Sequence, residues 1–154
     1  MAPAIVALIW LGMLIGVSFL ATPVKFIVQD LSLPVALQVG QATFDLFARV
    51  EWGLAAALVA TSGLAWRQRP LTLVLVLAIA SVVAVQAVWL LPALDARVDQ
   101  IVAGVTPAAS SHHMLYASLE AAKALLLAAA AFLALRRAGP TGLDAGALVQ
   151  TENS

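Results

Sequence analysis

Four long apolar stretches alternate with shorter polar ones along the chain. They cover about residues 4–21, 44–66, 71–91 and 111–135. Each stretch is long enough for an α-helix to cross a hydrocarbon core of about 30 Å, at a rise of about 1.5 Å per residue. The third is rich in β-branched residues, but its length favours a helix over a strand. The pattern therefore predicts an all-α membrane protein folded as a four-transmembrane-helix bundle.

The two longer connections also carry helix signals. Ser32 is a suitable N-cap and Pro34 suits a first turn, so residues 33–43 are predicted to form a helical lead-in to the second span. Pro92 predicts a kink or break after the third span. Residues 93–105 then place apolar side chains at helical spacing, which predicts an amphipathic helix. That helix either extends the third span or lies at the interface, so we expect helical extensions or interfacial helices on this side.

The composition supports a membrane protein. Of the 154 residues, 63% are hydrophobic and only 10% are charged, and the mean hydropathy is +1.01. Soluble domains have about 45–50% apolar residues and about 25% charged ones. The net charge is zero, so no basic surface suggests a nucleic-acid partner, and the absence of cysteine excludes disulfides and thiolate metal sites. The expected partners are the lipid bilayer and a homo-oligomer or a larger membrane complex.

The distribution of basic residues predicts how the chain is oriented. Residues 1–137 are predicted to form one membrane domain, and residues 138–154, which are polar and rich in glycine, a disordered cytoplasmic tail. The short loops and helix ends carry two groups of basic residues, Arg67, Arg69, Arg136 and Arg137 on the side of the N-terminus, and Lys25 and Arg97 on the other. Because cytoplasmic loops are enriched in Lys and Arg, this predicts a multi-pass protein of the cell (inner) membrane with both termini in the cytoplasm.

Five polar side chains within the apolar runs are the candidate site: Glu51, Gln86, Tyr116, Glu120 and Lys123. A charged side chain in hydrocarbon costs a few kcal/mol, so such residues are functional candidates. Glu120 and Lys123 are i, i+3 neighbours on one helix. Glu51 would add a second acid and leave an excess negative charge, which favours a cation or a proton. The candidates fall in the outer half or at the midplane, which predicts an outward-facing pocket. The alternative is an ion pair that neutralises itself and fixes helix packing.

His112 and His113 precede the last span and form a second, weaker candidate site. They could bind a metal ion, with Glu120 and the loop acids Asp95 or Asp99 as further ligands, or act as a pH-sensitive gate. The alternative is two solvated histidines at a helix start. Haem bound by this pair within one chain is disfavoured, because adjacent residues on a helix point about 100° apart. A haem shared between two protomers stays open, and the cofactor is otherwise unknown.

No enzyme motif stands out, since the chain has no GxSxG, HExxH or P-loop sequence. We therefore expect a protein without catalytic residues. The first hypothesis is a small integral membrane protein whose outward-facing intramembrane polar pocket binds or transports a small molecule, an ion or a proton. One alternative is a non-catalytic subunit or assembly partner of a larger membrane complex, and another is a haem- or quinone-linked redox protein.

The layout resembles the transmembrane-protein-205-like family of small four-span membrane proteins, whose function is poorly defined. The features that carry the resemblance are Phe44 and Phe47 at the entry to the second span, the Trp89-x-x-Pro92 exit of the third, the amphipathic helix that follows, and His113. Met114 stands where similar proteins have a glycine. The resemblance implies a four-span topology and no catalytic residue.

Overall fold

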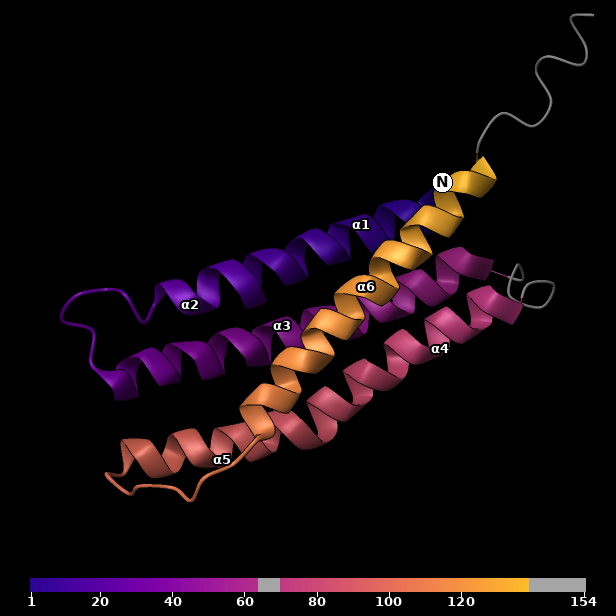
Figure 1. The fold of residues 1–154 in the computed structure, drawn as a ribbon. Coiled ribbons are helices and arrows are strands. Elements are labelled where there is room, and N and C mark those ends of the chain that lie inside the picture. The colour runs from indigo at the N-terminus through magenta and orange to yellow at the C-terminus, as the bar shows by residue number, and fades with distance from the viewer. Residues whose placement is uncertain (64–69, 139–154) are drawn as a thin grey trace, which may run out of the picture.

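The computed structural model describes residues 1–63 and 70–138, and this part of the chain is helical and without strands (Figure 1). The prediction of an all-α protein is therefore confirmed. The described residues form four successive helical rods. The first comprises α1 (Ala2–Leu14), η1 (Ile15–Ala21) and α2 (Thr22–Val24), and the second is α3 (Leu33–Ser62). The third comprises α4 (Pro70–Val85), η3 (Gln86–Leu90) and α5 (Leu91–Val102), and the fourth is α6 (His112–Ala138). The segments η1 and η3 are π-helical.

Three of the rods are long and apolar enough to cross a membrane: Ala2–Val24, Pro70–Val102 and His112–Arg136. This agrees with the predicted membrane protein. The second rod, α3, has the length, but Asp45, Arg49 and Glu51 make its central part much less apolar. The sequence-based prediction of four spans is thus supported for three, and the span within α3 remains a prediction.

The helix boundaries differ from the prediction in two places. The expected lead-in and second span form one helix, which begins after Ser32 and ends at Gly63, whose φ of +53° suits glycine. Pro92 does not break the third rod, because the preceding turn is π-helical and accommodates a residue that has no backbone N–H. The rod therefore continues through α5 to Val102, and Gly104, with φ +78°, lies just beyond its end. The basic turn with Arg67 and Arg69 and the predicted tail from residue 139 onward lie outside the described residues.

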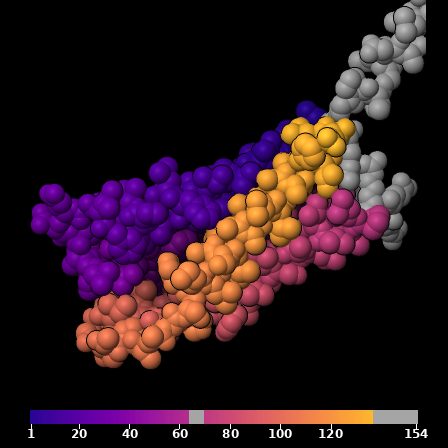
Figure 2. Space-filling view, in the orientation of Figure 1, coloured from indigo at the N-terminus to yellow at the C-terminus, as the bar shows by residue number. Residues whose placement is uncertain are grey.

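The rods pack around one apolar core. In Figure 1, α6 crosses in front of α3 in the space between α1 and α4, and it contacts α1 and α4; α3 contacts α1, α4 and α5. Figure 2 shows the side chains of α6 lying along the seam between these neighbours. The buried apolar side chains of the main core include Trp10, Leu14, Phe47, Leu58, Ile79, Val83 and Leu127. A smaller cluster contains Leu90, Leu91 and Tyr116 and packs against Phe44. Polar residues are buried between these two clusters.

Candidate functional site

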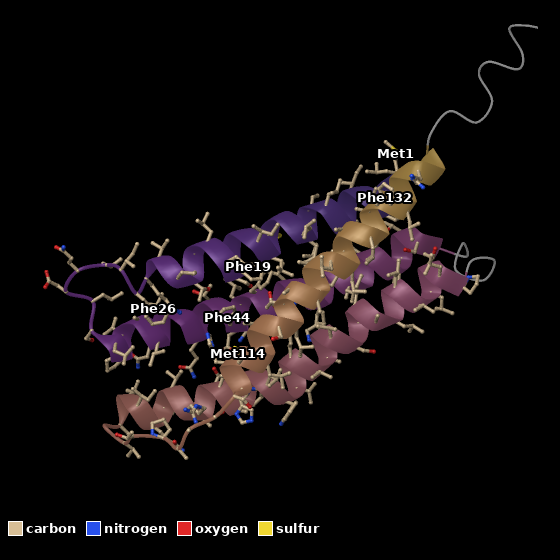
Figure 3. The ribbon with its side chains drawn as sticks, in the orientation of Figure 1. Met1, Phe19, Phe26, Phe44, Met114 and Phe132 are labelled. Carbon is tan, nitrogen blue, oxygen red and sulfur yellow. The ribbon has the colours of Figure 1, made fainter. Side chains whose placement is uncertain are left out.

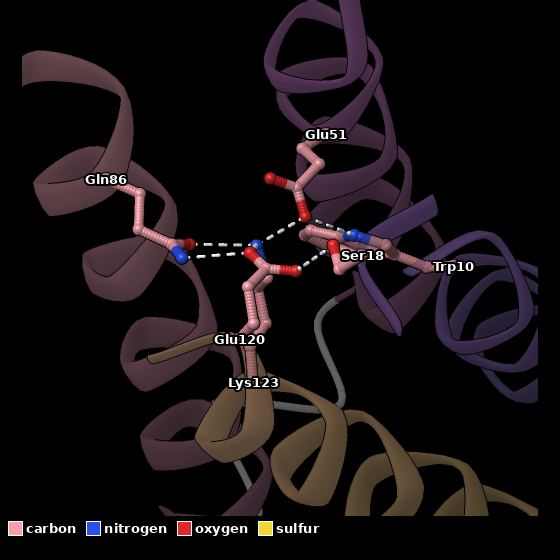
Figure 4. A network of polar contacts seen from close by, with 6 residues as sticks. All are labelled: Trp10, Ser18, Glu51, Gln86, Glu120 and Lys123. Carbon is pink, nitrogen blue, oxygen red and sulfur yellow. Dashed lines mark hydrogen bonds and ion pairs between the residues drawn. The ribbon is translucent and has the colours of Figure 1, made fainter. Parts of the chain in front are cut away.

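A connected group of six polar side chains joins all four rods in the interior (Figure 4). Four of them, predicted from the sequence, are 2% exposed or less, which confirms that they face the interior. We call the six residues the buried network: Trp10 and Ser18 from the first rod, Glu51 from α3, Gln86 from η3, and Glu120 and Lys123 from α6.

The ammonium of Lys123 is the centre of the buried network. Its Nζ lies 2.5 Å from Glu51 Oε1, 2.7 Å from Glu120 Oε1 and 2.8 Å from Gln86 Oε1. An ammonium has three N–H donors, so each donor has an acceptor of its own. The Lys123 side chain is 0% exposed. The buried cation is thus held by groups from three different rods.

The Glu120 carboxylate accepts hydrogen bonds at both of its oxygens. Ser18 Oγ donates to Oε2 at 2.7 Å, and Gln86 Nε2 donates to Oε1 at 2.8 Å, beside the Lys123 contact. The buried Tyr116 side chain also interacts with this carboxylate. Both oxygens of the Glu120 carboxylate are thus hydrogen-bonded.

Glu51 is held differently, because both of its contacts fall on one oxygen. Trp10 Nε1 donates to Oε1 at 3.0 Å, and the Lys123 ammonium lies against the same atom. Figure 4 shows the other carboxylate oxygen, Oε2, turned away from the contacts drawn, and no hydrogen bond or ion pair reaches it from the described residues. The two buried acids are therefore unequal in their surroundings.

The charges in the buried network do not balance when every group is ionised. Two carboxylates, Glu51 and Glu120, face one ammonium, which leaves one negative charge in a site closed to water. This is the excess that the sequence predicts. An unpaired charge in a low-dielectric interior is expensive, and such groups usually neutralise instead. One added proton would make the site neutral.

Two local irregularities in the helices position polar members of the buried network. Ser18 lies within η1 and Gln86 begins η3. In each segment a backbone N–H reaches back five residues, from Thr22 to Val17 and from Leu91 to Gln86, and a proline follows directly. A π-helical turn holds an extra residue and rotates the side chains relative to a regular α-helix, and such turns are frequent at functional sites.

The remaining candidate residues, His112, His113 and Tyr116, lie in the first turns of α6. Tyr116 packs edge-to-face on Phe44, with ring centroids 5.3 Å apart. His112 is half-buried against Trp89, and His113 is exposed. Neither histidine contacts the buried network. Residues 1–63 and 70–138 contain no group of three or more histidine, aspartate or glutamate side chains placed to hold a metal, and Glu120, considered as a ligand, is engaged inside the network.

The sequence did not single out Trp10 and Ser18. A tryptophan in an apolar run is usually a core residue, and a serine there is usually a small packing residue. One signal was available for Trp10: its indole N–H needs an acceptor when buried, and Glu51 is an unmatched acid in another span. Ser18 offered no comparable signal.

Comparison with known proteins gave one match. The sequence profile of a family described as "Domain of unknown function (DUF4149)" matches residues 5–103. The match covers α1 to α5, including Trp10, Ser18, Glu51 and Gln86, and ends before α6. No curated protein and no solved structure matched the chain. The resemblance to the transmembrane-protein-205-like family stays a prediction.

Proposed function

We propose a function from the site itself, because this chain belongs to the DUF4149 family, whose description assigns no activity: the protein binds and exchanges a proton inside the membrane. The proton is held by the buried network, and its exchange supports movement of protons or of another solute. The observation that carries this proposal is that one ammonium, Lys123, is shared by two buried carboxylates, Glu51 and Glu120. Two carboxylates and one ammonium leave one negative charge, and a bound proton neutralises it.

We assign the proton to Glu51. Glu120 receives hydrogen bonds from Ser18 and Gln86 and the contact with Lys123, so both of its oxygens already have partners. Glu51 has an oxygen, Oε2, that no described group contacts, so a proton there displaces no hydrogen bond. Lys123 and Glu120 then form the permanent ion pair, and Glu51 is the exchangeable acid.

A proton suits the site better than a larger ligand. All three donors of Lys123 are occupied, and the polar groups lie within 3.0 Å of their partners. A metal cation at Glu51 would have the Lys123 ammonium beside it, and like charges repel strongly where the dielectric constant is low. A proton needs no extra volume and no release of these contacts.

We further propose that α3 is the fourth span and that the protein resides in the cell (inner) membrane with both termini in the cytoplasm. Arg136 at the end of α6 and the basic residues of the turn at 67–69 support this orientation. The α5 end of the molecule then faces outward. Protons would reach Glu51 from that side, past the packed rings of Phe44 and Tyr116.

Infrared spectroscopy of the purified protein in lipid nanodiscs tests the charge count. The wild-type protein should show a protonated-carboxyl C=O band at neutral pH that shifts in D2O. Glu51→Gln and Glu120→Gln should each abolish it, because the one remaining acid is then matched by Lys123. Lys123→Met should strengthen it, since both acids must then be neutral. The exposed Asp30→Asn is the matched control and should leave it unchanged. Absence of the band from the wild-type protein would contradict the proposal.

Two further measurements divide the proposal into its parts. Glu51→Asp should shift the frequency of the band, whereas Glu120→Asp should leave it nearly unchanged, if Glu51 carries the proton. Proteoliposomes with an entrapped pH-sensitive dye test exchange across the membrane, where wild-type flux should exceed that of Glu51→Gln. A band without flux would reject transport.

Co-purification in mild detergent tests the alternative function. A stoichiometric partner would support the alternative of a subunit in a larger complex.

A further inference from the structure

A separate pocket lies at the other side of the Phe44–Tyr116 pair, between the start of α3, the segment after α2, and α5. Its volume is about 200 Å³, and no member of the buried network lines it. Figure 3 shows Phe26 and Phe44, two of its lining residues, at this end of the molecule. The lining also holds five aliphatic side chains and several polar or charged ones; the aliphatic ones are Leu37, Leu91, Leu94, Val98 and Ile101.

Lys25 brings a positive charge to this apolar pocket. Its side chain is half-buried, and its ammonium lies over the rings of Phe26, at 5.0 Å, and Phe44, at 6.0 Å. Within the described residues it forms no ion pair and no hydrogen bond. Burial lowers the pKa of Lys25, as expected for an ammonium without an anionic partner.

The backbone of α3 makes room for this ammonium. A Cβ atom added at Gly40 would collide with Lys25 Nζ, so the absence of a side chain at this position allows the ammonium to lie against the helix. Gly53, in the same helix, has nothing within 4 Å of an added Cβ. The position of Lys25 in the pocket therefore depends on a particular glycine.

The other charged groups of the pocket set the charge of a ligand. Arg97 donates from Nη1 to the backbone oxygen of Ala108 at 2.5 Å, and Asp95 is hydrogen-bonded to Gln41. Arg97 and Asp95 carry opposite formal charges without forming an ion pair, Asp45 and Asp99 act on Asp95 from beside the pocket, and His113 is the remaining titratable group in the lining. The Lys25 ammonium thus has no ion-pair or hydrogen-bond partner among the described residues, and it matches a ligand that carries a single negative charge. A doubly charged phosphate would also meet the Asp95 carboxylate.

We propose that this pocket binds an amphipathic monocarboxylate, namely a free fatty acid, with its carboxylate on the Lys25 ammonium and its chain against the apolar lining. Charge complementarity carries the choice of head group, and the aliphatic and aromatic walls carry the choice of tail. The inference uses none of the buried network and stands apart from the proposed proton exchange.

The first test uses the wild-type protein alone, in nanodiscs of phosphatidylcholine. Laurate labelled with carbon-13 at the carboxyl group should give a protein-bound resonance that empty nanodiscs lack. Unlabelled laurate should displace it, and dodecanol, which has the same chain without the charge, should be at least about tenfold weaker, as the loss of a charge-assisted hydrogen bond implies. Equal displacement by dodecanol would overturn the proposal, as would equal displacement by phosphatidic acid.

Variants then test the role of Lys25. Lys25→Gln should weaken laurate binding about tenfold or more, on the same grounds. Gly40→Ala should also weaken it, because the new methyl group displaces the ammonium while keeping its charge. Gly53→Ala makes the same exchange in the same helix without a contact and should bind laurate as the wild type does. Unchanged binding in both Lys25→Gln and Gly40→Ala would refute the site.

Discussion

Lys123 Nζ of α6 and Glu51 Oε1 of α3 lie 2.5 Å apart, with side chains that are 0% and 3% exposed. Glu120 Oε1 is almost as close to the same ammonium, at 2.7 Å. Breaking a buried ion pair costs more than forming it gains, because the remaining charge stays in the interior. The buried network therefore makes definite predictions for single and paired substitutions.

Lys123→Met should destabilise the protein by about 3–5 kcal/mol, the range for removing one partner of a buried pair. Adding Glu120→Gln should recover much of this loss, because the acid that lost its ion-pair partner is then removed. Titration of the unfolding equilibrium with sodium dodecyl sulfate in mixed micelles measures both free energies. Additive damage in the double variant would mean that Lys123 and Glu120 do not interact.

Trp10→Phe should cost about 1–3 kcal/mol, because the Glu51 oxygen loses its indole N–H donor. Trp52→Phe on α3 is the matched control. Trp52 is 45% exposed, so its substitution should change the free energy of unfolding by less than about 0.5 kcal/mol. The same unfolding titration compares the two variants. Equal effects would show that the Trp10 hydrogen bond contributes nothing to stability.

Ser18→Ala should cost about 1.5–3 kcal/mol, since Ser18 donates to the charged Glu120 carboxylate. Ser118→Ala provides the comparison, because Ser118 is exposed and its hydroxyl donates only to the backbone oxygen of Met114 in the same helix. We expect less than about 0.5 kcal/mol for that variant. A Ser18→Ala protein as stable as Ser118→Ala would remove Ser18 from the buried network.

Lys25 predicts a rise in stability with pH at alkaline values. Burial lowers its pKa in the folded protein below that of the unfolded chain, so the unfolded chain binds more protons between the two values. Stability therefore increases as the pH rises through the folded pKa, until the unfolded pKa is reached. Lys25→Met should be more stable than the wild type at neutral pH and should lack this rise. Unfolding midpoints measured against pH would contradict this if both proteins had the same slope.

The membrane class and most of the buried network follow from the sequence because burying charge is expensive. Glu51, Gln86, Glu120 and Lys123 stood out against apolar runs, and the i, i+3 spacing of the last pair placed them together. The excess of one acid was also visible. These inferences need only residue type and helical spacing.

The other features of the site depend on three-dimensional geometry that cannot be derived from the spacing of residues along the sequence. The pitch of 100° per residue fails through η1 and η3, so the sequence could not show that Ser18 and Gln86 turn toward the same carboxylate. The pitch did place His113 on the side of α6 that carries Glu120, but two helical turns separate them, and the structure leaves His113 outside the buried network. The apolar pattern predicts a span within α3, but the charges that define the site also lower the apolar character of that helix.

The position of Lys123 in the last helix also affects how the protein is made. Ribosomal synthesis delivers Glu51 and Gln86 to the membrane before Lys123 has been translated. Until α6 arrives, the Glu51 side chain lacks the only cation that reaches it among the described residues. An incomplete chain thus carries an uncompensated polar centre, which its nascent helices cannot bury stably. The buried network is therefore complete only when α6 packs against the other rods.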